Sequence, residues 1–199
     1  MYSYKKCFFS FIVFFTFVWW SVFADNTFDI GKVEQTWLTW TNDHRKELWL
    51  TGYTIDSKLT TTATERSNLA KTRTYISHER KKWDGYYNYS NIEKRFKDRN
   101  IVFQNIKRTT FTESIWWGFV KCPKEWDCTE ALTKATKSTW NFFMSEKNKK
   151  SQPHYKAIVN QYFTVMWVWV SIDPVSKKYY ITVHYGTKIL EKKIAIYNL

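Results

Sequence analysis

Two consecutive strand-like segments near the C-terminus most constrain the fold of this 199-residue chain. Residues 165–172 and 179–185 are rich in β-branched and aromatic side chains, and the residues between them, 173–176, read Asp-Pro-Val-Ser, a turn sequence. Apolar residues at helical spacing instead mark three longer segments, namely 28–50, 56–76 and 129–146. Because the helices come first and the antiparallel pair comes last, the sequence predicts an α+β domain.

Shorter elements are expected between these segments. Residues 90–99 and 154–160 are expected to form short helices, and residues 101–111 a loop or a strand. The chain contains no internal repeat, low-complexity tract or Gly/Ser-rich linker, and its length suits one domain. We therefore expect a single domain over residues 25–199.

The first 24 residues are expected to be a secretory signal peptide. Lys5 and Lys6 precede an apolar run, and Ala24 offers a small-residue cleavage site. The alternative is an uncleaved anchor, because residues 7–24 form a run long enough to cross a bilayer. The domain is accordingly expected to be secreted, or periplasmic and attached to the envelope if the run is retained.

Two cysteines, Cys122 and Cys128, would remain after cleavage. An even number of cysteines in an exported chain favours a disulfide bond between them. Two free thiols are the alternative. A metal-binding pair is less favoured, because no further cysteine or histidine cluster lies nearby in the sequence.

The formal net charge of +13 favours anionic surroundings such as cell-wall polymers or anionic lipid. The simpler interpretation is solubility in a lysine-rich chain, because the lysines are spread along the sequence. Nucleic acid is not an expected partner of an exported chain without a basic motif. We expect a monomer, which would contact a membrane only through an uncleaved N-terminus.

A series of short motifs runs through the chain in a fixed order. They are Asn42-Asp-His-Arg45, Leu50, Asp56-x-x-Leu59-x-x-x-Ala63, His78, Thr112-Glu113-Ser114-Ile115, Glu146 and His154-Tyr155-x-x-Ile158-Val159. Their order and spacing resemble the CAP superfamily, the cysteine-rich secretory, antigen 5 and pathogenesis-related-1 domains also called SCP domains. The resemblance is to a bacterial-type secreted member and covers about residues 33–190. Ser114 departs from the pattern, since the family usually has asparagine there.

The resemblance implies a fold and a site. The fold would be a three-layer α-β-α sandwich around a small antiparallel sheet. The site would be a cleft in which His78 and His154 face each other, with Glu113 and Glu146 beside them, while His44 and His184 do not belong to the set. Imidazole and carboxylate groups are good zinc ligands, so we expect these four residues to bind a divalent cation, with zinc as the first choice.

Family members are often binding proteins, so the resemblance implies binding of an extracellular ligand, such as a lipid, a sterol or a cell-envelope component. An enzyme is the less favoured prediction. One alternative is a metal-dependent extracellular hydrolase or protease in which Glu113 or Glu146 is the general base. Another alternative is a cationic cell-envelope-binding protein with a vestigial cleft. No nucleophile elbow or zinc-protease helix motif occurs in the sequence.

The balance of tryptophan and glycine is unusual. The chain holds 12 Trp and only 5 Gly, whereas glycine averages about 7% of residues. Several tryptophans stand where the family or a loop favours glycine: Trp49, Trp116, Trp126, Trp167 and Trp169. One hypothesis is that the gene reads TGA codons as glycine and was translated with tryptophan. The alternative is a genuinely Trp-rich protein.

Overall fold

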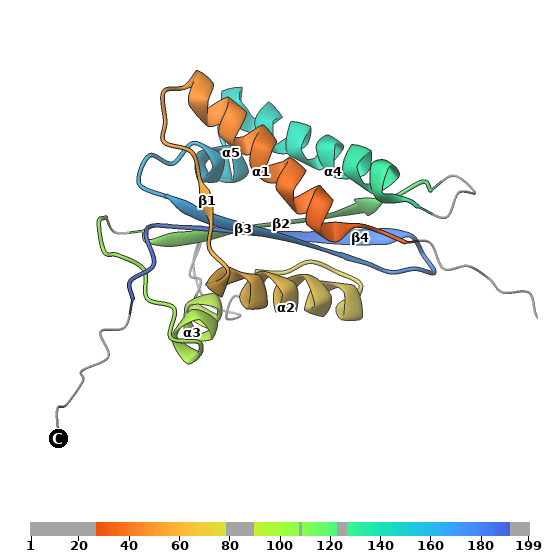
Figure 1. Ribbon diagram of the computed structural model, residues 1–199, viewed down its shortest axis with the longest axis horizontal. Helices are drawn as coiled ribbons and strands as arrows, with labels where there is room; N and C mark the ends of the chain where they lie inside the picture. Colours follow the sequence, from red (N-terminus) through yellow and green to blue (C-terminus); the bar gives the residue numbers. More distant parts are fainter. Residues whose placement is uncertain (1–26, 79–89, 108, 123–126, 192–199) are drawn as a thin grey trace, which may run out of the picture.

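The computed structural model describes residues 27–78, 90–107, 109–122 and 127–191, which form three layers (Figure 1). The elements in chain order are α1 Ile30–Glu47, β1 Thr54–Ile55, α2 Lys58–Arg73, α3 Ser90–Asp98, β2 Phe111–Phe119, α4 Thr129–Met144, the 3₁₀ helix η1 Ser145–Asn148, α5 Pro153–Ile158, β3 Val165–Ile172 and β4 Lys178–Gly186. The predicted signal segment and Trp126 lie outside the described residues. Among the helices that the structure describes, none combines the length and apolar character of a membrane-spanning segment.

The sheet has four strands in the order β1-β3-β4-β2. The predicted pair, β3 and β4, is antiparallel, and β2 pairs antiparallel with the other side of β4. The α+β class is therefore confirmed. The sheet is mixed rather than wholly antiparallel, because the two residues of β1 pair parallel with the start of β3.

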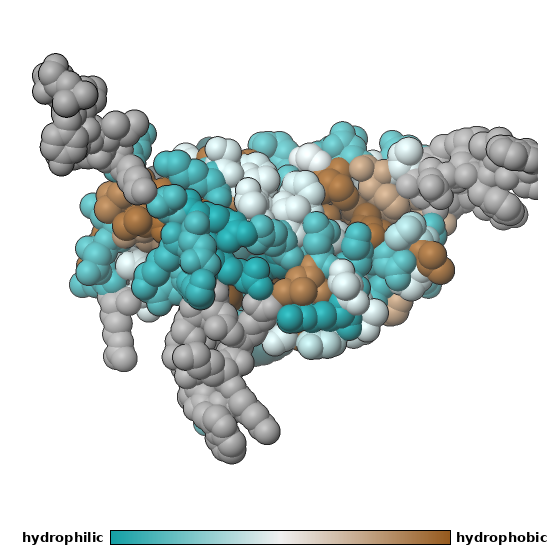
Figure 2. Space-filling view, turned by 90° about the horizontal axis from the view of Figure 1, so that it is seen from below, coloured by the Kyte–Doolittle hydropathy of each residue, from teal (hydrophilic) through white to brown (hydrophobic). Residues whose placement is uncertain are grey.

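Helices cover both faces of the sheet. The helices α1, α4 and α5 lie on one face, and α2 and α3 lie on the other (Figure 1). The larger core, between the sheet and α1 and α4, includes Trp37, Phe143 and Val183. A smaller core under α2 and α3 includes Leu59 and Phe96. Figure 2 shows the α2 and α3 side, where hydrophobic residues gather in separate patches on a largely hydrophilic face.

Arg45 joins α1 to the segment that leads from α5 into β3. Its side chain is fully buried and donates hydrogen bonds to the carbonyl oxygens of Thr51, Ile158, Asn160 and Phe163, at 2.7–3.2 Å. The guanidinium carbon also lies 3.9 Å from the ring centre of Tyr53. Because a buried guanidinium must be hydrogen-bonded, Arg45 fixes where α5 ends relative to α1.

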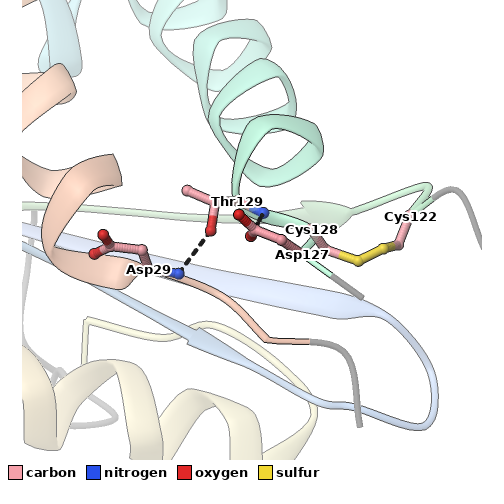
Figure 3. The surroundings of a disulfide bond; sticks show 5 residues. All are labelled: Asp29, Cys122, Asp127, Cys128 and Thr129. Carbon is pink, nitrogen blue, oxygen red and sulfur yellow. Dashed lines mark hydrogen bonds between the residues drawn. A yellow bond between two sulfur atoms is a disulfide. The ribbon is translucent and has the colours of Figure 1, made fainter. Parts of the chain in front are cut away.

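The disulfide Cys122–Cys128 ties the chain after β2 to the beginning of α4, with the two Cα atoms 5.4 Å apart (Figure 3). Next to it, the Asp127 carboxylate accepts a hydrogen bond from the Thr129 N–H at 2.9 Å. The Thr129 hydroxyl in turn accepts one from the Asp29 N–H at 2.8 Å, at the beginning of α1. The disulfide predicted from the cysteine count therefore lies where α1, α4 and the end of β2 meet.

Candidate functional site

Glu113, on β2, is the centre of a buried polar cluster, and its side chain is 0% exposed. Arg66 of α2 donates from Nε to Oε2 at 2.9 Å. The Nδ1 atom of His78 lies 2.9 Å from Oε1, and Nε2 of His184 lies 3.0 Å from Oε2. The strand register accounts for the last contact, because Glu113 of β2 and His184 of β4 are direct partners across the antiparallel ladder.

The partners of Glu113 decide its charge. Burial alone would raise the pKa of this carboxyl group, but hydrogen bonds from His184 and His78 and the charge of Arg66 outweigh it and hold the pKa well below its ordinary value. Glu113 is therefore a carboxylate at any pH near neutral, held by three side chains from three segments of the chain.

Glu146, on η1, makes the second cluster. Its carboxylate accepts hydrogen bonds from the backbone N–H groups of His154 and Tyr155, at 2.9 and 3.2 Å. The same carboxylate lies 2.7 Å from Nδ1 of the His154 ring. Pro153 occupies the first turn of α5, so Glu146 caps the start of that helix and orients the ring at once.

His154 lies in an aromatic enclosure. Its ring stacks on Phe143 with the two ring centres 4.0 Å apart, and its distance to the Trp116 ring is 6.4 Å. Burial lowers the pKa of His154 and outweighs the opposing effect of Glu146, and the charge of a protonated His78 lowers it further. His154 is therefore neutral near pH 7.

The structure arranges the four predicted residues as two histidine–carboxylate pairs, His78 with Glu113 and His154 with Glu146. In the part of the chain that the structure describes, no three His, Cys, Asp or Glu side chains converge as a group that would hold a metal ion. Each carboxylate binds Nδ1 of its histidine. In metal sites such a carboxylate orients the ring so that the other nitrogen, Nε2, binds the cation.

Two members of the Glu113 cluster, Arg66 and His184, were not predicted as site residues. His184 is fully buried, and its second nitrogen, Nδ1, lies 3.0 Å from the Thr62 hydroxyl. Aligning β2 with β4 would have identified His184, the partner of Glu113, but not Arg66, which lies on α2. The sequence alone did not reveal that β2 pairs with β4.

A small pocket with room for about one water molecule lies beside the Glu113 cluster. Its walls come from α2, from the segment after that helix and from β2; the lining residues are Arg66, Leu69, Ala70, Arg73, Tyr75, Ser77 and Ile115. The pocket is therefore mainly apolar with two arginines at its wall, and it adjoins the residue that precedes His78.

Comparison with known proteins gives structural relatives only. No protein-family model matches the sequence, and no curated protein is similar to it. An extracellular protein of Bacillus anthracis that contains an SCP domain is 18% identical, with a TM-score of 0.54 over 80% of this chain. An outer surface protein of Borrelia burgdorferi is 16% identical, with a TM-score of 0.53 over 77% of this chain. The CAP domain of enterococcal PrgA is 14% identical, with a TM-score of 0.57 over 85% of this chain.

The match spans 41% of the Bacillus protein, 91% of the Borrelia protein and 70% of the enterococcal chain. Two of these structures are named after an SCP or CAP domain. With its order of elements and three layers, the chain thus has the fold of bacterial CAP (SCP) domains.

Proposed function

We propose that this protein is an extracytoplasmic CAP-domain protein that binds a divalent cation between His78 and His154. The observation that supports the proposal is the pairing of each imidazole, through Nδ1, with a buried carboxylate. Imidazoles oriented in this way by a carboxylate are common zinc ligands, and the pair would supply two of the three or four protein ligands that zinc sites usually have. A bound cation would supply a Lewis acid that polarises an oxygen atom of a ligand.

The ligand that we propose is an extracellular lipid, sterol or cell-envelope component. Apolar side chains line the pocket beside Glu113, while Arg66 and Arg73 supply charge at its wall. The pocket has room for only a small part of such a ligand, so most of the ligand would lie on the surface around it. The disulfide and the extracellular or outer-surface relatives support a location outside the cytoplasm.

Binding fits the geometry better than the hydrolase alternative. A general base needs a carboxylate that can take a proton from water near neutral pH. The Glu113 carboxylate is fully buried, accepts hydrogen bonds from three side chains and has a pKa well below its ordinary value. The Glu146 carboxylate accepts two backbone N–H groups besides the His154 ring. Both carboxylates therefore suit the role of holding a histidine.

Isothermal titration with zinc tests the cation site. His78→Ala and His154→Ala should each weaken zinc binding at least about 100-fold, because loss of a mere outer partner already costs about 10–100-fold. His44→Ala is the matched control, since His44 bonds Glu47 outside both clusters and should leave the affinity within about twofold. Unchanged affinity in both test variants would refute the proposal. Envelope binding that falls steeply with salt and ignores both variants would favour the cationic alternative.

A further inference from the structure

Arg66 contacts both groups that hold His78. Its Nε donates to Glu113 Oε2 at 2.9 Å and its Nη2 donates to Glu113 Oε1 at 3.2 Å, so the guanidinium binds the carboxylate in a bidentate manner. Nη2 also donates a hydrogen bond to the carbonyl oxygen of Ser77, the residue before His78. One side chain of α2, 4% exposed, thus fixes the backbone next to His78 and the carboxylate that binds its ring.

His184 supports the same carboxylate from the sheet. Its ring is fully buried. Its Nε2 is hydrogen-bonded to Glu113 Oε2, and its Nδ1 is hydrogen-bonded to the Thr62 hydroxyl. The ring also meets Phe96 of α3 edge to face, with the ring centres 5.2 Å apart. Glu113 is therefore held between α2 and β4, and its oxygens have little freedom to turn away from His78.

The two histidines of the site need this support to different degrees. His154 lies in the first turn of α5, where the helix, Glu146 and the stacked Phe143 ring all orient it. His78 lies beyond the end of α2, in a stretch that is neither helix nor strand. Among the described residues, Glu113 contacts its ring and Arg66 contacts the carbonyl group of the preceding residue, Ser77.

We propose that Arg66 is a positioning residue of the cation site, assisted by His184. It acts through Glu113 and the Ser77 carbonyl, and it holds His78 with Nδ1–H toward Glu113 and Nε2 toward the cation. The part of this inference that concerns zinc rests on the proposed function. The part that concerns the His78 ring does not.

Nitrogen-15 NMR of the imidazoles, in the full chain without metal, tests whether Arg66 fixes the tautomer of the His78 ring. At a pH where the rings are neutral, His78 should be in the Nδ1–H tautomer in the unmodified protein. Arg66→Gln should give a mixture of tautomers at His78 and leave His154 unchanged. Arg66→Lys should restore part of the preference of His78 for the Nδ1–H tautomer. Lysine keeps the charge but cannot donate to both Glu113 oxygens and to the Ser77 carbonyl at the same time. Lys58→Gln, at an exposed position of the same helix and away from the pocket, is the control.

Zinc affinity supplies the second readout. Arg66→Gln should weaken zinc binding about 10–100-fold, as losses of outer partners do, while Lys58→Gln should stay within about twofold. A folded Arg66→Gln protein with the His78 tautomer and the zinc affinity of the unmodified chain would overturn the inference. If Arg66→Gln does not fold, an Arg66→Lys protein identical to the unmodified one in both readouts would overturn it equally. Failure of the unmodified protein to bind zinc would refute the proposed function, and the NMR comparison would still decide the role of Arg66.

Discussion

At the scale of single residues, Trp49 stands out because its backbone conformation suits glycine. It has φ of 59° and is 96% exposed, directly after the end of α1. The Leu50 N–H bonds the Arg45 carbonyl at 2.9 Å, and the Trp49 N–H bonds the Lys46 carbonyl at 3.0 Å. These two bonds define the helix end that glycine usually completes at this position. The positive φ and these two hydrogen bonds therefore support the hypothesis that residue 49 is glycine in the natural protein.

Trp49→Gly should therefore raise the free energy of unfolding by about 1 kcal/mol, because a side chain at positive φ costs about 1–2 kcal/mol. Urea unfolding measures the change. Trp49→Ala is the control, since alanine removes the indole but keeps the strained Cβ. An equal gain in both variants would assign the effect to the indole. Peptide masses of the protein from its own source would separately show which residue is present at 49, 116, 126, 167 and 169.

Glu34 is a buried acid of α1 that the candidate site does not use. It is 7% exposed, and within the described structure Oε1 has no hydrogen-bond partner. Burial raises the pKa of Glu34 to about 8, from an ordinary value of 4.5. Between these two pH values the folded chain keeps the proton that the unfolded chain loses, so stability falls as the pH rises from about 4.5 through about 8.

Glu34→Gln should remove that loss of stability. The variant should match the natural protein near pH 4.5 and exceed it above pH 8, by at most about 5 kcal/mol in the free energy of unfolding. Urea unfolding at several pH values gives the curve. Glu130→Gln, at an exposed position of α4, should show the slope of the natural protein. A Glu34→Gln protein with that same slope would contradict the argument.

At the scale of elements, the packing of α5 depends on Arg45. Its guanidinium pairs the carbonyl oxygens of Ile158, Asn160 and Phe163, which follow one another around the end of α5. Without these bonds the carbonyl groups would be left with fewer partners in a buried region. The asparagine nearby, Asn42, makes a similar two-bond contact with the Tyr53 backbone, at 2.7 and 2.9 Å. The first sequence motif is therefore structural.

Arg45→Met should lower the free energy of unfolding by about 1–3 kcal/mol or more, because it leaves buried carbonyl groups without their hydrogen-bond donor. Amide hydrogen exchange should quicken first in α5. Because His154 lies in the first turn of that helix, its ring would be held less firmly as well. Arg73→Met, at an exposed position of α2, should change stability by less than about 0.5 kcal/mol. Unaltered exchange in α5 would show that Arg45 does not hold this helix.

The elements differ in how far the sequence predicts them. The three long helices, the short helix at 90–99, α5, and the pair β3 and β4 follow from periodicity and turn residues, with boundaries within a few residues. The strand β2 was not predicted beyond residue 111, because two of its three consecutive buried residues, Glu113 and Ser114, are polar. Its partners lie across the sheet, so no local pattern of apolar residues marks it.

At the scale of the whole molecule, the site joins segments that are far apart in sequence. His78 follows α2, Glu113 lies on β2, Glu146 and His154 lie around the start of α5, and His184 lies on β4. Sequence motifs supplied the four predicted residues. The division into two pairs, and the roles of Arg66 and His184, depend on strand register and on packing between α2 and the sheet, which a single sequence does not encode locally.

Anomalous X-ray scattering at the zinc edge, from crystals grown with zinc, tests the central claim most directly. We expect one strong peak from a zinc ion bound by Nε2 of His78 and Nε2 of His154, with the Glu113 and Glu146 carboxylates still bonded to the two Nδ1 atoms. Zinc bound directly by either carboxylate, or a peak away from both histidines, would contradict it.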